Sequence, residues 1–211
     1  MKDQYVYVIG NKLYVNLTNR CSNACDFCVR NYDSGPAAKH GYEGYDLWLD
    51  KEPSANDVEE MATRVLADGK DIEEVVFCGF GEPTYRLDVM CEVADFAHAR
   101  GLRTRVNTNG QGSEINGRDI SADIASHIDT VNVSLNATDA KKYDEICHSI
   151  YGKRGFDAML DFAKKCVMRG ADVVLSVVDI IGEEEIEKAQ AIADSIGARL
   201  RVRAMIHESD C

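Results

Sequence analysis

Hydrophobic and polar residues alternate over several short stretches of this chain, which is the pattern of β-strands that bury one face. Two such stretches, residues 5–9 and 13–17, are separated by the turn-forming residues Gly10, Asn11 and Lys12, and together they predict a β-hairpin. Five further stretches predict strands over residues 74–78, 103–107, 130–135, 172–178 and 199–204.

Between these strands, apolar residues recur with the period of an amphipathic helix. The pattern predicts helices over residues 54–68, 87–100, 140–150, 156–168 and 183–196. Ser54 has the side chain of a helix N-cap. Glycines follow four of the predicted helix ends, at Gly69, Gly101, Gly170 and Gly197. Strands that alternate with helices predict a parallel sheet with right-handed crossovers.

The length of the chain limits how this sheet can close. The 211 residues hold about six βα units of roughly 30 residues each, whereas a closed barrel contains eight. Because no change in composition divides the chain, residues 1–211 are expected to form one domain. That domain is either an open, partial TIM-like (βα)6 barrel with an N-terminal β-hairpin or a doubly wound sheet.

The polar residues within the strands favour the partial barrel. In VNVSLN at residues 131–136, Asn132, Ser134 and Asn136 share one face, and the apolar residues share the other. Parallel strands covered by helices on both faces are apolar throughout. Here the helices require the apolar face, so the polar row is expected to line a cavity.

Arginines alternate in the same way on two strands. Arg105 lies in the stretch RTRVN, and Arg201 and Arg203 lie in RLRVR. These three side chains are expected either to line the cavity and bind an anion or, for the last strand, to lie on a solvated sheet edge.

The net charge and the composition limit the classes of molecule that this protein is expected to bind. The formal net charge of −12 opposes contact with nucleic acid or anionic membranes over most of the surface. No stretch resembles a signal peptide or a membrane span, so a cytoplasmic protein without a membrane partner is expected. Eight cysteines in a reducing compartment predict metal ligands or core thiols rather than disulfides.

Three of the cysteines lie close together, in the stretch NRCSNACDFC. Cys21, Cys25 and Cys28 form the spacing C-x3-C-x2-C directly after the second predicted strand, at the end of the barrel where active sites are built. Because iron–sulfur clusters are usually held by four cysteine thiolates, three thiols predict a four-iron cluster with one open iron. A zinc site completed by His40 is the alternative.

The remaining cysteines have simpler explanations. Cys91, Cys147 and Cys166 each lie on the apolar face of a predicted helix and are expected in the core. Cys78 precedes a glycine turn and is expected near the cavity. The role of Cys211 stays open.

The cysteine stretch resembles the signature of the radical SAM superfamily, with Phe27 in its aromatic position. The resemblance implies that the three cysteines hold a 4Fe–4S cluster and that S-adenosylmethionine binds the open iron. It further implies reductive cleavage of the cofactor to a 5′-deoxyadenosyl radical, which abstracts a hydrogen atom from a substrate, with an electron donor such as flavodoxin or ferredoxin.

A second stretch, VVFCGFGEPTYR at residues 75–86, is similar to the GGEP motif of the superfamily. Gly81, Glu82 and Pro83 match the motif, which implies that they hold the methionyl amine of the cofactor. Phe80 stands where the family has glycine. The resemblance also implies cofactor contacts for the residues at the ends of the later strands, namely Asn107, Ser134, Asn136 and Val177.

Within the superfamily, the stretches GYDLWLDKEPS and VSLNA are most similar to the TatD-associated radical SAM proteins. This implies a functional link to a TatD-type nuclease. Three functions stay open: hydrogen abstraction from a small anionic molecule bound by Arg105, Arg201 or Arg203, activation of a protein partner through a glycyl radical, and a non-catalytic zinc- or iron-binding module.

Overall fold

The computed structural model describes residues 3–32 and 44–205, and its centre is a seven-stranded sheet in which the strands follow chain order. Its strands are β1 (Val6–Ile9), β2 (Lys12–Val15), β3 (Glu74–Phe77), β4 (Arg103–Thr108), β5 (Thr130–Ser134), β6 (Asp172–Val178) and β7 (Arg199–Arg203). β1 and β2 form the predicted antiparallel hairpin, and every later pair is parallel. Because β1 and β7 do not pair, the expected open, partial TIM-like barrel is confirmed.

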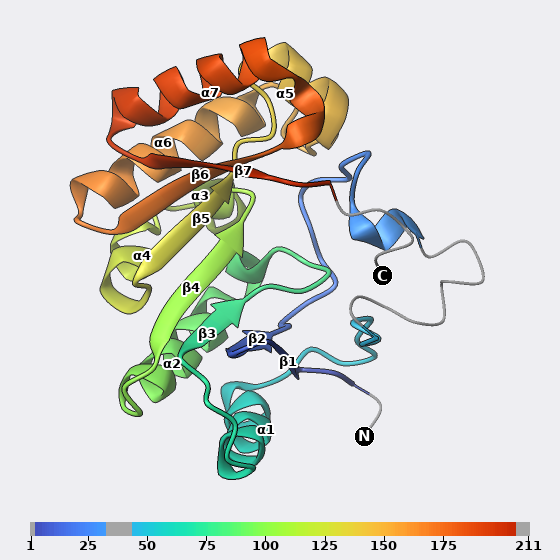
Figure 1. The fold of residues 1–211 in the computed structure, drawn as a ribbon, viewed down its shortest axis with the longest axis vertical. Coiled ribbons are helices and arrows are strands. Elements are labelled where there is room, and N and C mark those ends of the chain that lie inside the picture. The colour runs from blue at the N-terminus through green and yellow to red at the C-terminus, as the bar shows by residue number, and fades with distance from the viewer. Residues whose placement is uncertain (1–2, 33–43, 206–211) are drawn as a thin grey trace.

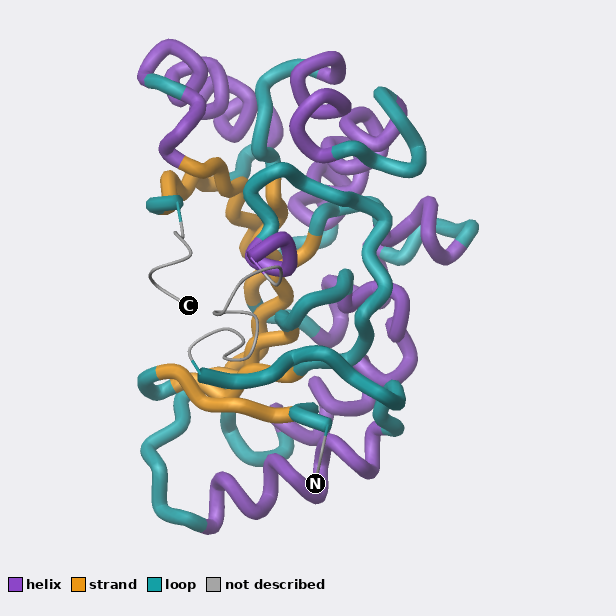
Figure 2. The backbone as a smooth tube through the Cα atoms, turned by 90° about the vertical axis from the view of Figure 1, so that its right-hand side faces the viewer, coloured by secondary structure: helices purple, strands orange, loops and turns teal. Residues whose placement is uncertain are grey.

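Helices cover one side of this sheet. The strands form a curved wall, and the helices lie on its convex side (Figures 1 and 2). The larger helices are α1 (Ala55–Ala67), α2 (Leu87–His98), α5 (Ala140–Cys147), α6 (Arg154–Met168) and α7 (Glu183–Ile196). The sequence pattern missed two short helices, α3 (Gly112–Asn116) and α4 (Ser121–His127), because five to seven residues are too few to show a helical period.

The local signals at the helix ends act as predicted. The Ser54 side chain accepts a hydrogen bond from the Asp57 amide at 3.2 Å, and the Asp57 carboxylate accepts one from the Ser54 amide, which completes a capping box. Gly101, after α2, has a φ of +73°, a left-handed conformation that glycine adopts without strain.

The core lies between the sheet and the helices. Val131, Val133 and Leu135 have no exposed surface and belong to the same core cluster as Met159 and Phe162 of α6. The alternating residues of the same strands therefore point to the concave side. There the register places Asn132 beside Asn107 and Val174, so the ends of neighbouring strands build a lining in layers.

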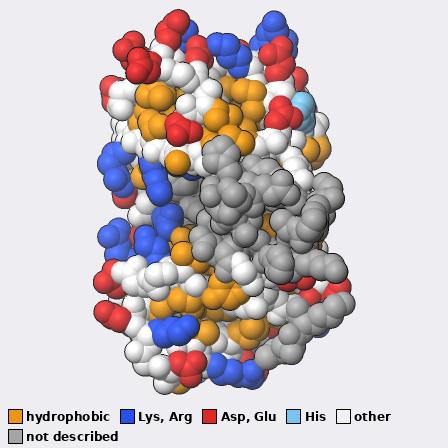
Figure 3. All heavy atoms as spheres, turned by 45° about the vertical axis from the view of Figure 1, so that its right-hand side comes forward, with side chains coloured by type: hydrophobic (Ala, Val, Ile, Leu, Met, Phe, Trp, Pro, Cys, Tyr) orange, Lys and Arg blue, Asp and Glu red, His pale blue; other side chains and the backbone are white. Residues whose placement is uncertain are grey.

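Charged side chains are distributed unevenly over the surface. In Figure 3, hydrophobic side chains gather in the upper and lower parts of the view, and Lys and Arg side chains run down one edge between them. None of the helices in the described ranges has the length and apolarity needed to cross a bilayer.

Candidate functional site

The loop that carries the three cysteines follows β2 and lies across the end of α5. The Ala24 amide donates to the Cys147 carbonyl at 2.9 Å, and the Asp26 amide donates to the Ile146 carbonyl at 3.0 Å. The Ile150 amide returns a bond to the Ser22 carbonyl at 2.9 Å. These three bonds fix the loop to a segment more than 120 residues away in the sequence.

Arg30 closes the loop from its other end. Its guanidinium donates to the Asn19 carbonyl at 3.1 Å and to the Asn23 carbonyl at 3.3 Å. The two carbonyls precede and follow Cys21, so one side chain holds the backbone on both sides of the first cysteine. The same positive charge lowers the pKa of Cys21 and of Cys25, although larger effects outweigh it.

The thiols do not converge on a common point in the ligand-free chain. Cys25 shares a hydrogen bond with Cys147, which together with burial raises its pKa above the usual range of a thiol. Burial, and then the charge of Glu82, raise the pKa of Cys21 to about 12. Across the described residues, no three His, Cys, Asp or Glu side chains lie close enough to share a metal ion. Cluster binding by Cys25 therefore requires its side chain to turn away from Cys147.

A buried polar network lies beneath the loop. The Gln111 side chain, which has no exposed surface, donates to the Asn23 amide oxygen at 3.0 Å and to the Tyr143 hydroxyl at 2.9 Å. It accepts a bond from the Ser149 hydroxyl at 3.1 Å. This network joins the cysteine loop, β4 and α5, and sequence reasoning missed it because its members are far apart in the chain.

Glu82 holds the loops of β3 and β4 together. Its carboxylate is 3% exposed and accepts four hydrogen bonds: from the Thr84 amide and hydroxyl at 3.2 and 2.7 Å, the Thr108 hydroxyl at 2.7 Å and the Asn109 amide at 2.7 Å. The Glu82 amide donates to the Arg20 carbonyl at 2.8 Å. Burial raises the pKa of this carboxyl, and the donors oppose the shift because they stabilise the charged form. The Glu82 carboxylate thus serves mainly to join the loops.

Asn109 extends this link to the cysteines. Its side-chain amide lies 3.8 Å from the Cys21 sulfur and donates to the Ser22 hydroxyl at 2.8 Å. Its oxygen accepts from the Gln111 amide at 2.9 Å. Asn109 thus lies in direct contact with the first cysteine.

The glycines around Phe80 are needed because other backbone passes close by. A Cβ atom on Gly81 would lie 2.1 Å from the Thr18 carbonyl oxygen and 2.7 Å from that of Arg20, and one on Gly79 would lie 2.0 Å from the Asn16 amide oxygen. The residue between them has room for a side chain, so the departure from the GGEP motif leaves the turn intact.

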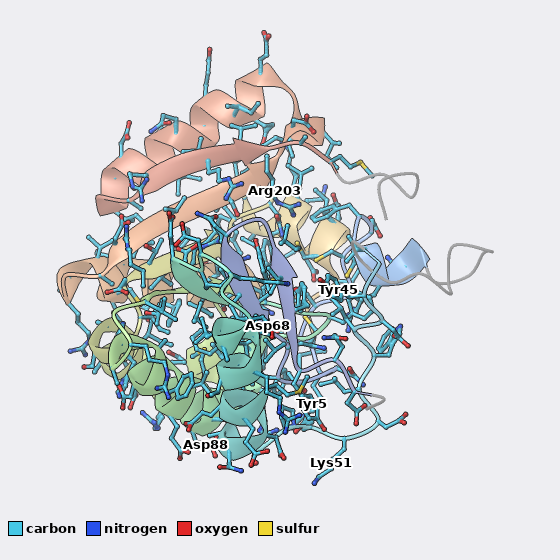
Figure 4. The ribbon with its side chains drawn as sticks, turned by 60° about the horizontal axis from the view of Figure 1, so that its bottom comes forward. Tyr5, Tyr45, Lys51, Asp68, Asp88 and Arg203 are labelled. Carbon is cyan, nitrogen blue, oxygen red and sulfur yellow. The ribbon has the colours of Figure 1, made fainter. Side chains whose placement is uncertain are left out.

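The Phe80 ring has its own partners. It is 7% exposed, belongs to a small cluster with Tyr7 and Leu47, and packs edge-on against Trp48 with ring centroids 5.1 Å apart. Tyr45 stacks near Tyr7 in the same cluster (Figure 4). Phe80 therefore anchors the segment that follows residue 44 to the end of β3.

A cavity of about 390 Å³ lies beside the cysteine loop. Its walls are mainly apolar and come from the cysteine loop, α5, the end of β6, α7 (Glu185) and the segments that follow β5, β6 and β7. The lining includes Phe27, Asn136, Ile146, Val178, Ile181 and Met205. The sequence had indicated Phe27 and Asn136, but not Ile146, Ile181 or Met205, which come from elements with no motif.

Asn136 contributes an unpaired acceptor to this cavity. It has a left-handed φ of +57° and is 4% exposed. Its amide nitrogen donates to the Cys147 sulfur at 3.5 Å, and its buried oxygen has no hydrogen-bond partner in the described part of the chain. A buried, unpartnered oxygen in a cavity wall is suited to accept a hydrogen bond from a ligand.

Val177, for which the resemblance implies a cofactor contact, does not line this cavity. Val177 has no exposed surface and belongs to the core on the helix side, whereas Val178 lines the cavity. Successive residues of a strand point to opposite faces, so a shift of one position exchanges core for cavity.

Ser134 and Asn107 lie on the concave face, as predicted, but not in the wall of this cavity. Ser134 pairs with Ser176 in the ladder, one layer below Asn136. Asn107 accepts a hydrogen bond from Arg105 at 3.2 Å and shares one with the Cys78 thiol, which confirms that Cys78 is near the concave lining.

The three predicted arginines lie at different depths. Arg203, at the end of β7, has its guanidinium 5.9 Å from the centre of the Phe27 ring (Figure 4). Arg201 lies one layer lower, beside Ser176. Arg105 lies deeper still and forms an ion pair with Glu74 at 3.2 Å. They do not form a single cluster.

The remaining cysteine predictions can be compared directly. Cys147 and Cys166 are fully buried, and Cys91 is partly buried against the same core, as expected. His40 and Cys211 lie outside the described residues.

Taken together, the donors fit the cofactors that the resemblance implies. Three thiols on one loop are the ligands of an iron–sulfur cluster. The cavity beside them has apolar walls, an aromatic ring at Phe27 and the free oxygen of Asn136, which suit an adenosyl group. Cys21, Cys25 and Cys28 would hold the cluster, and the cavity residues would hold S-adenosylmethionine.

Comparison with known proteins agrees with this chemistry. Residues 15–196 match the model of the Radical SAM superfamily. Among the curated proteins, none matches the chain.

Solved structures share the fold. SuiB from Streptococcus suis bound to S-adenosylmethionine superposes with a TM-score of 0.70 at 18% identity, over 94% of this chain and 41% of SuiB. For anSMEcpe with bound AdoMet the TM-score is 0.66 at 14% identity, over 92% of this chain and 50% of the other. A radical SAM methyltransferase from Sphaerobacter thermophilus gives 0.59 at 13% identity, over 97% and 70%. The chain thus spans less than half of the length of SuiB.

Replacing the Glu82 carboxylate should weaken the mouth of the barrel. In Glu82→Gln, an amide NH2 group faces buried donors, which we expect to lower the free energy of unfolding by about 2–3 kcal/mol. Urea unfolding measures this change, and Glu73→Gln, at an exposed position, is the matched control. Equal stability of Glu82→Gln and the native protein would contradict the role assigned to the carboxylate.

Restoring the usual glycine at residue 80 should destabilise the protein. Phe80→Gly removes the ring that packs on Trp48, and loss of a buried Phe side chain costs about 3–5 kcal/mol. Because Trp48 is the only tryptophan, its fluorescence should shift to longer wavelength as it gains solvent. Phe96→Ala, on α2, should leave the emission maximum unchanged, and an unchanged maximum in Phe80→Gly would show that the ring contact is absent.

Proposed function

This chain belongs to the radical SAM superfamily, and from that premise we propose that it abstracts a hydrogen atom from a small anionic molecule held on the concave side of the barrel. When bound, a reduced 4Fe–4S cluster supplies an electron to S-adenosylmethionine, whose cleavage gives methionine and a 5′-deoxyadenosyl radical. The chain is a radical SAM enzyme, which sets aside the non-catalytic zinc- or iron-binding module.

The observation that carries the proposal is the shared wall between the thiol loop and the cavity. Asp26 and Phe27, between the second and third cysteines, line the cavity in which Asn136 presents its free oxygen. The cluster ligands and the cofactor cavity are therefore parts of one continuous site.

Different residues supply the apolar walls, the charged rim and the polar base of this site. Ile146, Val178 and Ile181 supply apolar surface and exclude water. At the rim, Lys142 and Glu185 form an ion pair at 2.8 Å. Below the cavity, the polar side chains of Ser134 and Ser176 face the space in which a substrate would approach the cofactor.

A protein substrate is the second candidate. Trp48 is 39% exposed and Ile180 is 53% exposed, and Ile180 lies at the rim of the cofactor cavity. Exposed apolar residues beside a mouth favour contact with a protein surface. Activation of a protein through a glycyl radical would use this rim rather than the arginines of the concave face.

The partners follow from the same proposal. An electron donor such as flavodoxin or ferredoxin would reduce the cluster in the cytoplasm. The motifs at residues 14–32, 44–54, 75–84 and 133–137 support a place among the TatD-associated radical SAM proteins and a functional link to a TatD-type nuclease.

The central test is production of 5′-deoxyadenosine. Protein reconstituted anaerobically with iron and sulfide, then mixed with dithionite and S-adenosylmethionine, should form it, and mass spectrometry detects it. Cys25→Ala should abolish formation, while Cys91→Ala, a thiol outside the loop, should retain it. Formation that is equal in Cys25→Ala, or absent from fully loaded native protein, would contradict the proposed function.

Asn136 should contribute to cofactor affinity. Asn136→Gly keeps the left-handed backbone and removes only the amide. Loss of one buried hydrogen bond of about 1.4 kcal/mol should raise the Kd for S-adenosylmethionine about tenfold. Equilibrium binding to the reconstituted, unreduced protein measures this, with Asn11→Gly in the hairpin turn as the control. Equal Kd values would remove Asn136 from the site.

A further inference from the structure

A second cavity, of about 590 Å³, lies on the concave face below the cofactor site. Its walls come from the first residues of six strands, β2 to β7. It is therefore at the opposite ends of the strands from the cysteine loop, and we call it the floor cavity. No residue of the cysteine loop contributes to its lining.

The floor cavity is positively charged. It is lined by five basic residues, Lys12, Arg103, Arg105, Arg199 and Arg201, and by two acidic residues, Glu74 and Asp172. The resulting local charge of +3 contrasts with the charge of −12 on the whole chain. Lys and Arg side chains also gather along one edge in Figure 3. A basic cavity in an acidic protein concentrates anions against the overall field.

Three of the five cations form ion pairs, and they share the two carboxylates. Lys12 and Arg105 both pair with Glu74, at 3.1 and 3.2 Å. Arg199 pairs with Asp172 at 2.7 Å. Both acidic residues of the cavity, Glu74 and Asp172, therefore already have basic partners.

The other two cations keep their charge. Arg103 donates to the Thr130 hydroxyl at 3.5 Å, a neutral acceptor. For Arg201, the described part of the chain provides no carboxylate within 4.0 Å. A guanidinium presents several N–H donors in one plane, which matches the oxygens of a phosphate or carboxylate.

Asn132 adds a polar group one layer below Arg201. Its side chain lines the cavity, and its buried oxygen has no hydrogen-bond partner among the described residues. Along β5 it lies between Thr130 on the floor and Ser134 below the cofactor site. A molecule that extends from floor to cofactor would pass this side chain.

We propose that the floor cavity binds the anionic end of the substrate, with Arg201 pairing with its phosphate or carboxylate group and Asn132 binding a neighbouring polar atom. This inference rests on the proposed function and deepens it. By register Arg201 lies in the layer of Ser176 and Ser134, one layer below Asn136. One layer spans two residues, or about 7 Å at roughly 3.3 Å per residue, so the charged group of the substrate lies about 7 Å below the end that faces the cofactor.

Anion binding can be tested without turnover. Reconstituted protein with S-adenosylmethionine is titrated calorimetrically with inorganic phosphate and, in a parallel arm, with malonate, at constant ionic strength. We expect saturable binding of at least one anion, weakened at least fivefold by Arg201→Gln. Arg64→Gln, on the exposed face of α1, should change the Kd less than twofold. Tighter binding of phosphate would indicate a phosphoryl group on the substrate, and tighter binding of malonate would indicate a carboxylate group.

Two results would overturn the proposal. One is that neither anion shows saturable binding up to about 10 mM. The other is that the native protein and Arg201→Gln bind the anion with the same Kd. Arg201→Lys keeps the charge and should retain more binding than Arg201→Gln, so equal losses in the two variants would also count against it. Circular dichroism shows whether each variant folds. If 5′-deoxyadenosine forms but neither phosphate nor malonate binds, the floor cavity is rejected as an anion site and the proposed function stands. If an anion binds but no 5′-deoxyadenosine forms, the proposed function is rejected and anion binding in the floor cavity stands.

Discussion

A buried carboxylate at the end of β3 joins the loops from which the mouth of this open barrel is built. The Glu82 carboxylate accepts hydrogen bonds from Thr84, Thr108 and Asn109. The Glu82 amide donates to the Arg20 carbonyl in the loop that follows β2. A buried charge is costly unless its hydrogen bonds are complete, so the loops can hold only the arrangement that supplies all of these donors. The position of Asn109 beside Cys21 follows from this constraint, as does the close backbone passage that requires Gly81.

The alternation of side chains on the strands separates two environments. The apolar residues meet the helices, and the polar residues form layers on the concave face. Because the sheet remains open between β1 and β7, those layers are not filled as they are in a closed barrel. The upper layer forms the apolar cavity at Asn136 and Val178, and the lowest layers form the basic floor. One sheet thus carries an apolar cavity beside the cysteine loop and a basic cavity nearer the first residues of its strands.

Local signals in the sequence predicted much of this structure, and contacts between distant segments account for the rest. The strands, the larger helices and the thiol loop were predicted because periodicity, caps and cysteine spacing are local. Local signals do not show that Val178, and not Val177, lines the cavity, because the residue at which a strand enters the site depends on its register with its neighbours. The Gln111 network and the packing of Phe80 on Trp48 join segments with no shared motif, so no pattern in one stretch indicates them.

The hydrogen bonds between the cysteine loop and the end of α5 also affect the order in which this region can form during translation. The strands pair in chain order, so the sheet can grow as the chain leaves the ribosome. The thiols of residues 21–28 emerge early, but the carbonyls of Ile146 and Cys147 that fix their loop emerge only after about two thirds of the chain has been made. During translation the three thiols are therefore carried by a loop that the growing chain cannot yet hold in place.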